Sequence, residues 1–318
     1  MARGRVGDAV DTPYRGGRDL SRKRGSMSSG SQVSRDGLPG APGSLLNDLA
    51  QWVADVGDRT IEWLVALGSI AIFAGRMMRW LIRKRPQRET ILWNFYHIGV
   101  LSLPVVAMTG MFIGMVLAVQ SYAQFKMLNL ETRLGAVINM SLVRELGPVL
   151  AATMLAGRVG SAMAAELGTM RVTEQIDALT VMGADPIHYL AVPRFLACLF
   201  LIPALTLMAD FMGVVGGYFY SVHILNIDAY YYLQNSAEYV GLFDLAAGTA
   251  KTLFFGASIA VIACHHGFHC EPGAEGVGRA ATYAFVHSFV AILLLDLVLG
   301  IILEAIYGML WSTAPRLV

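Results

Sequence analysis

The sequence contains few charged residues. Asp, Glu, Lys and Arg make up 15% of its 318 residues, whereas an average soluble domain contains about 25%. Hydrophobic residues make up 55%, and the mean hydropathy is +0.55. A chain with so few water-facing side chains does not fit a set of soluble domains, and its apolar content excludes a wholly disordered protein. The composition predicts a polytopic membrane protein.

Several motifs of catalysis and binding are also missing. The chain has no G-x-x-x-x-G-K-[ST] phosphate-binding loop, no G-x-S-x-G and no H-E-x-x-H. The segment GAEGVG at 273–278 has the wrong spacing for a dinucleotide fingerprint. Three cysteines are too few for a disulfide framework, and a net charge of +1 gives no support to a nucleic-acid partner. We therefore expect no catalytic centre and no cofactor bound by this chain.

The near-neutral total hides a basic N-terminal part. Residues 1–89 hold 15 Lys and Arg against 9 Asp and Glu, a balance of +6, and the remainder carries −5. Residues 1–44 are rich in Gly, Ser, Arg, Pro and Asp, without apolar periodicity. They are predicted to form a disordered basic tail. The tail has no apolar run typical of a secretory signal peptide, and its four Asp residues count against an organellar transit peptide.

Residues 45–89 are predicted to contain an amphipathic helix. Apolar side chains recur at helical spacing over 45–85, and the segment ends in a cluster of Arg and Lys around Trp80. Its most apolar part, Trp63 to Gly75, is short for a span of about 20 residues. This pattern favours a helix that lies in the cytoplasmic membrane interface. The alternative is an ordinary first membrane span.

Residues 90–318 are predicted to form an all-α transmembrane domain. Five segments are apolar enough to cross a membrane: 98–119, 134–165, 195–225, 242–264 and 280–311. The basic residues before the first span place the N-terminus in the cytoplasm, so five spans place the C-terminus outside.

Charged residues inside these spans cost roughly 2.5–3.5 kcal/mol each on insertion scales, so they require partners or water. They are Arg144, Glu145, Arg158, Glu166, Asp210, Asp296 and Glu304. Because Arg144 and Glu145 are adjacent, they point to different sides of a helix and are expected to pair with different segments. The set indicates either a polar, gated pathway or structural ion pairs with snorkelling side chains.

Small residues recur every four positions in two spans. The second span carries Ala156, Gly160 and Ala164 at this spacing, and the first span carries Gly110 and Gly114. Small residues permit close helix contact in a bilayer. The spacing indicates either packing within one bundle or a seam between two subunits or moving helices.

Residues 168–186 form a short polar segment between two strong spans. Gly168 and Gly183 bracket it, and Asp185-Pro186 favours a stop. A small cytoplasmic helix here has too little surface to fold alone, so it is either a docking element for another protein or a plain connecting loop.

Residues 264–270, CHHGFHC, concentrate Cys and His. Such a tract can bind zinc, but its spacing matches no standard finger and no second ligand pair follows. We expect no metal site, and the alternative is an intramembrane metal-dependent enzyme that uses His265, His266 and His269.

Three separated blocks together resemble one family. RELGPVLAATMLAGRVGSAMAAELGTMRVTEQIDALTVMGADPIHYLAVPR (144–194) resembles the signature region of MlaE/YrbE-type permeases, and HIGVLSLPVVAMTGMFIGMVLAVQ (97–120) and GAEGVGRAATYAFVHSFVAILLLDLVLG (273–300) match in the same order. The resemblance covers residues 45 to 311. The tail 1–44 and the tract 264–270 depart from it.

The resemblance implies an interfacial helix plus five spans with a short cytoplasmic coupling helix, in the permease of an ABC transporter. Such permeases are homodimers that bind two ATPases, which hold the ATP and Mg²⁺, and periplasmic MCE-domain proteins, often with a small STAS-domain protein. They move phospholipids or related lipids. The residues implied for the ATPase contact are Thr173, Glu174, Gln175, Asp177 and Leu179.

The resemblance also implies a location and a role for the charged residues. The location is the bacterial inner membrane, which is favoured over the chloroplast inner envelope, and the RELGP and AGRVG segments are implied to flank the lipid cavity. A passive channel lined by the intramembrane charges stays open as a third function. The lipid species and the direction of transport do not follow from the sequence.

Overall fold

The computed structural model describes residues 42–83 and 88–310, and these residues form helices joined by short turns. No strand occurs among them, which confirms the all-α prediction. The chain divides into two compact units, Met1–Asp58 and Arg59–Val318. The predicted tail 1–44 lies outside the described residues up to residue 41, and α1 (Pro42–Arg83) begins three residues before the expected start of the amphipathic helix.

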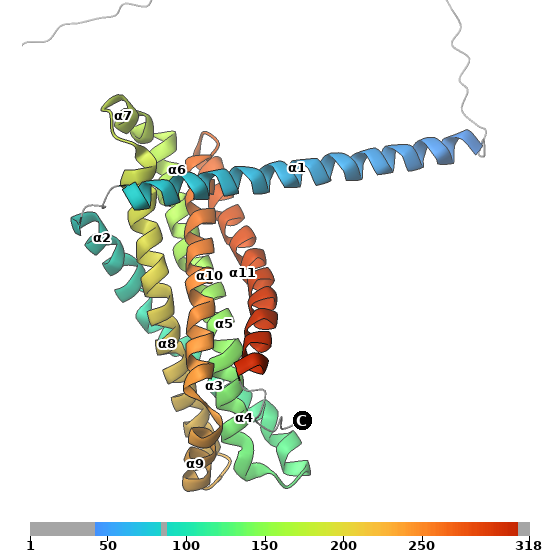
Figure 1. Ribbon diagram of the computed structural model, residues 1–318, viewed down its shortest axis with the longest axis vertical. Helices are drawn as coiled ribbons and strands as arrows, with labels where there is room; N and C mark the ends of the chain where they lie inside the picture. The colour runs from blue at the N-terminus through green and yellow to red at the C-terminus, as the bar shows by residue number, and fades with distance from the viewer. Residues whose placement is uncertain (1–41, 84–87, 311–318) are drawn as a thin grey trace, which may run out of the picture. The chain divides into compact units, whose positions relative to one another are not determined.

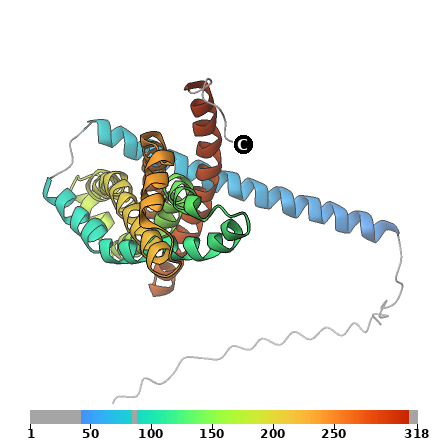
Figure 2. The ribbon, with the colours of Figure 1, turned by 90° about the horizontal axis from the view of Figure 1, so that it is seen from below.

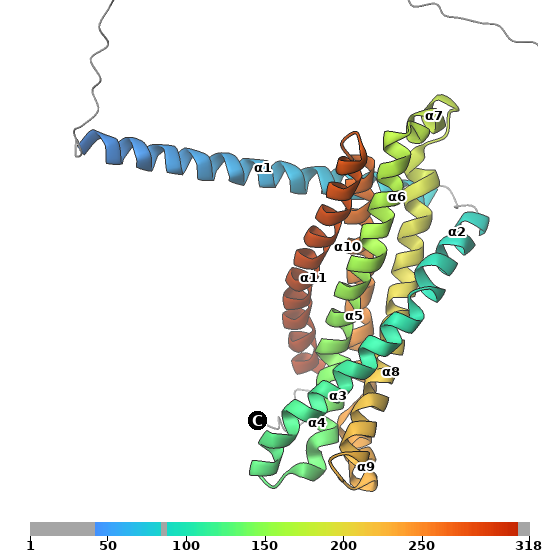
Figure 3. The ribbon, with the colours of Figure 1, turned by 180° about the vertical axis from the view of Figure 1, so that it is seen from behind.

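The second unit contains the remaining helices, in which long helices alternate with several shorter elements (Figure 1). They are α2 (Arg88–Phe95), η1 (Tyr96–Val100), α3 (Leu103–Met127), η2 (Glu131–Arg133), α4 (Leu134–Ser141), η3 (Leu142–Leu146), α5 (Gly147–Leu155), η4 (Ala156–Gly160), α6 (Ser161–Val172), α7 (Gln175–Val181), η5 (Ile187–Ala191), α8 (Val192–His223), α9 (Ala229–Tyr239), α10 (Leu242–Phe268) and α11 (Ala274–Leu310). The short helices α7 and α9 lie at opposite ends of the bundle (Figures 1 and 3).

Six segments of the described chain are long and apolar enough to cross a membrane, so the protein is a multi-pass membrane protein. They are Leu64–Arg83, Glu89–Met127, Glu131–Val172, Ile187–His223, Leu242–Phe268 and Ala274–Met309. The last five overlap the five predicted spans. The first lies in α1 and was not among the five predicted spans. Its length and composition fit the alternative prediction, in which this segment is an ordinary first membrane span.

The contacts of α1 within the second unit fall at one end of the bundle. Ser69 Oγ lies 3.1 Å from Nε2 of His265, near the C-terminal end of α10, and Phe73 packs against Phe268 with ring centroids 5.6 Å apart. Eleven residues after Ser69, Trp80 meets the ring of His188, which lies in η5 just before α8. A span would contact its neighbours along their lengths. These contacts favour the interfacial placement of this part of α1, which stays a prediction.

The packed core lies between α5, α6, α8 and α10. Buried side chains of these helices include Leu155, Leu167, Ile202, Phe255 and Ile259. By contrast, only 6% of the most apolar window of α11 is buried. In the end-on view of Figure 2, α11 (red) stands at the edge of the group. Most of α11 therefore has an apolar surface that the described residues do not cover.

Helices α3 and α8 touch at the backbone because small residues line their contact. A β-carbon at Gly114 would overlap the carbonyl oxygen of Gly213, and one at Gly110 would overlap the carbonyl oxygen of Ala209. Glycine removes that obstacle, and close backbone approach is how helices gain van der Waals contact in a bilayer. The two glycines thus lie at a seam within one chain.

The second span is interrupted by two π-helical turns, which the sequence analysis did not anticipate. In η3, the backbone N–H of Gly147 donates to the carbonyl of Leu142, and Pro148 follows without an N–H of its own. A wider turn before a proline accommodates the lost hydrogen bond, and such turns are frequent at functional sites. The charged residues Arg144, Glu145 and Arg158 all lie inside these two turns.

Candidate functional site

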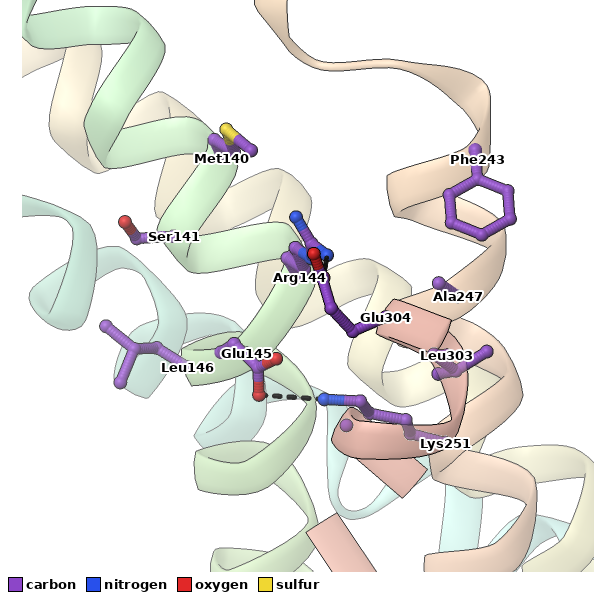
Figure 4. A pocket seen from close by; sticks show the side chains of 11 residues that line it. Met140, Ser141, Arg144, Glu145, Leu146, Phe243, Ala247, Lys251, Leu303 and Glu304 are labelled. Atoms are coloured by element: carbon purple, nitrogen blue, oxygen red, sulfur yellow. Dashed lines mark hydrogen bonds and ion pairs between the residues drawn. The ribbon is translucent and has the colours of Figure 1, made fainter. Parts of the chain in front are cut away.

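A pocket of about 450 Å³ opens between η3, α10 and α11 (Figure 4). It combines apolar side chains with an unusual density of charge. The residues that line it are Met140, Ser141, Arg144, Glu145, Leu146, Phe243, Ala247, Lys251, Gly300, Leu303 and Glu304. Lys251 lies nine residues after the start of α10 at Leu242, which is about 14 Å along the helix. The pocket therefore lies in the half of the bundle nearer α9.

Lys251 is the most buried charge of the pocket, with a side chain 2% exposed. Its Nζ donates to Oε2 of Glu145 at 2.7 Å and to Oδ1 of Asp296 at 3.1 Å. The lysine thus joins three elements, because Glu145 lies in η3 and Asp296 in α11. A buried cation is tolerated when carboxylates accept its hydrogen bonds, and removal of one member leaves the others uncompensated.

Arg144 forms a separate pair at the rim of the same pocket. Its guanidinium donates to Oε2 of Glu304 on α11 and lies 5.9 Å from the ring centroid of Tyr307. The side chain of Glu304 is 68% exposed, against 26% for Arg144. Arg144 and Glu145 thus pair with different segments, as their adjacency on a helix requires.

The arrangement gives the pocket a defined chemistry. Two cations, Arg144 and Lys251, and two carboxylates, Glu145 and Glu304, line a space that apolar side chains also border. Within the bundle these ion pairs experience a lower dielectric than at a water-exposed surface, so they are screened less. The exposed Glu304 is the partner most easily displaced from its cation, so the pocket can accept an anionic group at Arg144 beside apolar walls.

The other predicted intramembrane charges lie elsewhere. Glu166 pairs with Arg194 at 2.8 Å, and the buried Arg194 also donates to the carbonyl of Leu190. This pair joins α6 to the start of α8 near the α7 end, away from the pocket. Nη1 of Arg158 and Oδ1 of Asp210 are buried and form no hydrogen bond with the described part of the chain. Asp210 packs against Gly147 at the η3 turn.

The small residues of the second span face neighbouring helices of this chain. Ala156 and Ala164 are fully buried, and a β-carbon at Gly160 would lie 3.3 Å from Ile259 on α10. With Gly110 and Gly114 facing α8, all five predicted packing residues lie between helices of one chain. Their contacts account for the spacing without a second subunit.

The segment 168–186 contains a helix, α7, with an exposed apolar tip. Ile176 is buried, and Leu179 packs in part against the main core. Arg171 forms an ion pair with Asp177 at 2.5 Å. Val181 and Met182 are 89% and 73% exposed. Among the residues implied for the ATPase contact, Leu179 therefore serves the fold in part, and the exposed tip lies two residues further on.

The entry into α7 is sharply turned. Glu174 has a φ of 59°, in the left-handed region that non-glycine residues seldom adopt. This turn reverses the chain after α6 and presents Thr173, Glu174 and Gln175 at the end of the bundle, where all three are exposed. This geometry favours the prediction of a docking element over that of a plain connecting loop.

The Cys and His tract lies where α10 meets α1 and α11. The rings of His265 and His269 stack with centroids 4.4 Å apart, and Nε2 of His266 lies 2.8 Å from Nδ1 of His287. Burial raises the pKa of the Cys270 thiol, which disfavours the thiolate that metals bind. Within the described residues, no group of three or more His, Cys, Asp or Glu is arranged to hold a metal ion.

Sequence reasoning missed three features of these sites. Lys251 was visible as the lone charge in an apolar run of α10, yet only the structure joins it to Glu145 and Asp296. Val181 and Met182 were not among the residues predicted for the ATPase contact, although both are exposed apolar side chains. The π-helical turns that carry Arg144 and Arg158 have Pro148 as their only local signal, and that signal precedes just one of the two turns.

Comparison with known proteins identifies the family. The family model described as "Permease MlaE" matches residues 91–302. A "Probable ABC transporter permease protein" of Rickettsia felis is 44% identical over 75% of this chain and 92% of its own length. The "Intermembrane phospholipid transport system permease protein MlaE" of Haemophilus influenzae is 34% identical over 80% of this chain and 98% of its own.

A plant protein is also similar. "Protein TRIGALACTOSYLDIACYLGLYCEROL 1, chloroplastic" of Arabidopsis thaliana is 37% identical over 73% of this chain and 66% of its own length. The matched region includes α7 and the pocket-lining residues other than Leu303 and Glu304. The resemblance noted from the sequence is confirmed: this chain belongs to the MlaE permease family and is an ABC transporter permease.

Proposed function

We propose that this protein is the membrane subunit of a lipid transporter, which moves phospholipids between the membrane it spans and a periplasmic MCE-domain protein. One observation carries the proposal, namely the pocket of paired charges around Lys251 and Arg144 within an apolar bundle. A phospholipid needs both kinds of surface, because its headgroup is charged and its chains are apolar. The name of the Haemophilus influenzae relative supports the substrate class.

The headgroup is proposed to enter at the rim, where Arg144 exchanges the exposed Glu304 for a phosphate. Guanidinium groups bind phosphate with two parallel hydrogen bonds, which makes this exchange chemically matched. Lys251 stays paired to Glu145 and Asp296 and holds η3, α10 and α11 in register. The acyl chains extend along the apolar surface of α11, which the part of the chain that the structure describes leaves uncovered.

The energy source is proposed to be a partner ATPase. The chain has no phosphate-binding loop, and ABC transporter permeases work with an ATPase that binds ATP and Mg²⁺. We propose that α7 is the coupling helix that docks on this ATPase, through Glu174 and Gln175 together with the apolar tip Val181–Met182. ATP-driven closure of the ATPases moves α7 and reshapes the pocket, with no covalent intermediate on this chain.

The proposed orientation places α7 in the cytoplasm and α9 outside, with a cytoplasmic N-terminus and a periplasmic C-terminus. The Lys and Arg residues near the first span support it. We propose a bacterial inner membrane as the location, with the chloroplast relative marking the alternative of an inner envelope. A homodimer is the proposed assembly, because the exposed apolar face of α11 leaves room for a second copy. A STAS-domain protein is an expected further partner in some systems.

Reconstitution tests the proposal. The full chain is incorporated into liposomes with its ATPase and an MCE-domain acceptor, and phospholipid transfer is measured with and without ATP. We expect ATP-dependent transfer that is lost when Glu174→Lys and Asp177→Lys are combined, because these reversals repel the docking surface. Full coupling in that double variant would count against α7 as the contact. Ion conductance of the chain alone, without ATP, would instead support the passive channel.

Metal analysis decides the enzymatic alternative. We expect no stoichiometric zinc in the purified chain, because no arranged ligand group occurs within the described residues. Stoichiometric zinc that disappears together with lipid-modifying activity in the His265→Ala, His266→Ala, His269→Ala variant would replace the transport proposal with a metalloenzyme.

A further inference from the structure

A second cavity lies on the opposite flank of the bundle from α11. One face of α2, η1 and the start of α3 lies alongside α8 (Figure 3), and the two walls enclose a groove of about 1010 Å³. The first wall contributes Glu89, Leu92, Trp93, Phe95, Tyr96, Gly99, Val100 and Leu103, and α8 contributes Leu201, Ala204, Leu205 and Met208. We call these residues the α2–α8 groove.

The first wall presents a stripe of side chains along α2, η1 and the start of α3. Glu89, Trp93, Tyr96, Val100 and Leu103 follow one another at steps of three or four residues, and all five line the groove. All five are exposed, with Trp93 at 60% and Tyr96 at 51%. The fold therefore holds this stripe open toward the groove instead of packing it inside the protein.

The opposite face of the same segment is buried. Asn94 and Ile98 are nearly covered, and the side chain of Asn94 donates to the carbonyl of Thr90 within the helix. At the floor of the groove, Gly99 allows the side chain of Leu201 to approach closely. Burial of this face fixes the rotation of the segment about its own axis. The fold therefore determines which side chains are exposed to the groove.

The chemistry along the stripe runs in one direction. Among the side chains that the structure describes, Glu89 is the one charged residue that lines the groove, and it stands at the N-terminal end of α2. Trp93 and Tyr96 follow one and two turns later, and beyond them the walls are aliphatic apart from Met208. In the proposed orientation the Glu89 end faces the cytoplasmic surface of the membrane. A carboxylate and aromatic rings thus lie at headgroup depth, and an apolar channel leads from them into the bilayer.

We propose that the α2–α8 groove binds a zwitterionic phospholipid whose headgroup ends in an ammonium group. The ammonium lies between the Glu89 carboxylate and the face of Trp93, and the acyl chains fill the aliphatic part beside Val100, Leu103 and Leu205. Aromatic faces attract cations, with tryptophan the strongest, and a carboxylate accepts charge-assisted hydrogen bonds from an ammonium. An anionic headgroup without an ammonium meets only repulsion at Glu89.

This site is separate from the pocket around Lys251. The pocket offers two cations and would engage a phosphate, whereas the described lining of the groove holds a carboxylate and would engage the ammonium. No residue lines both. The groove therefore selects lipids by the ammonium group of the headgroup, whereas the pocket binds the phosphate.

Native mass spectrometry of the purified full chain tests the site. The protein is equilibrated with equal amounts of phosphatidylethanolamine and phosphatidylglycerol that carry identical acyl chains, and the bound lipids are counted. We expect wild type to retain phosphatidylethanolamine in preference. Glu89→Gln is expected to lower that preference about fivefold to tenfold, as loss of one charge-assisted contact implies. Trp93→Leu is expected to lower it as well, and Trp93→Phe to lower it less, because phenylalanine keeps an aromatic face.

Two control variants make the result specific. Glu238→Gln removes an exposed carboxylate on α9, and Phe112→Leu removes an exposed aromatic ring on α3 outside the groove. Each should keep the wild-type preference. The proposal is overturned if wild type shows no preference, or if Glu89→Gln and Trp93→Leu, folded as judged by thermal unfolding, retain the wild-type value.

Discussion

At the scale of single residues, the central feature is the buried side chain of Lys251. Lys251 is 2% exposed, while its partners Glu145 and Asp296 are 48% and 23% exposed. The buried lysine thus pairs with two partly exposed carboxylates, of which Glu145 lines the pocket. Such an arrangement ties three helical elements together and keeps one side of the cluster open to a ligand.

Removal of the lysine charge should therefore destabilise the bundle. In Lys251→Met, the two carboxylates lose their shared cation, and the loss of hydrogen bonds to charged groups costs about 1.5–3 kcal/mol. We expect a clearly lower midpoint of thermal unfolding for the purified protein in detergent. The matched control is Arg279→Met, which breaks the exposed pair with Glu271 and should cost less than about 1 kcal/mol. Equal shifts for both variants would contradict the account of Lys251.

The α3–α8 seam supplies a second residue-scale prediction. Gly114→Ala places a methyl group against the carbonyl of Gly213, and forced separation of packed helices costs about 1–3 kcal/mol. Gly75→Ala in α1 is the control, because a β-carbon there meets nothing within 4 Å and alanine favours a helix by about 0.5–1 kcal/mol. Thermal unfolding should shift down for Gly114→Ala and up or not at all for Gly75→Ala. A stabilised Gly114→Ala would show that the helices do not touch there.

At the scale of elements, the short helix α7 could be predicted from the sequence, but the face that it exposes could not. The polar sequence between two spans indicated a short helix, and the resemblance implied contacts at Thr173 to Leu179. The structure turns Ile176 and part of Leu179 inward. It leaves Val181 and Met182 exposed, although they are apolar. Which face of a seven-residue helix points outward depends on its packing against α6, and the sequence of α7 does not contain that information.

The exposed tip should matter for coupling and not for folding. With Val181→Asp and Met182→Asp combined, we expect thermal unfolding close to wild type and a loss of ATPase binding, since two charges then occupy the apolar contact. Met127→Asp is the matched control, because Met127 is 84% exposed at the end of α3, remote from α7. Binding is measured by co-purification of the ATPase with the tagged chain. Unchanged binding by the α7 variant would exclude the tip as the contact.

The π-helical turns illustrate what pattern alone does not supply. The sequence placed Arg144 and Glu145 in a span and required that they pair with different segments, and the structure meets that requirement. It could not reveal that both residues lie in a widened turn, because an extra residue in a helical turn leaves the apolar periodicity almost intact. Pro148 and the small residues around it were the only local signs.

At the scale of the whole molecule, composition and apolar runs were sufficient for the fold class and for five of the six candidate spans. They were insufficient for α1, whose apolar part is long enough to cross a membrane yet contacts only one end of the bundle in the second unit. The pairing of side chains between different helices could not be predicted either. Lys251 finds Glu145 from 106 residues away in sequence, and no spacing rule connects them.

Topology can be tested with single cysteines. In a Cys270→Ser background, where Cys198 and Cys264 are buried, a cysteine is introduced by Glu238→Cys on α9 or by Glu174→Cys before α7. We expect a membrane-impermeant maleimide to label the α9 variant in intact cells and the α7 variant only after permeabilisation. The reverse pattern would invert the proposed orientation and place the docking helix on the wrong side for an ATPase.

The central claim is that the pocket around Arg144 and Lys251 receives the headgroup of a phospholipid. The most direct measurement uses a phospholipid with a photoactivatable headgroup, crosslinked to the reconstituted transporter and mapped by peptide mass spectrometry. The account predicts crosslinks to pocket residues such as Met140 and Leu303, reduced about tenfold in Arg144→Met, the equivalent of about 1.4 kcal/mol of lost affinity. Crosslinks that spare the pocket, or that persist unchanged in Arg144→Met, would contradict it.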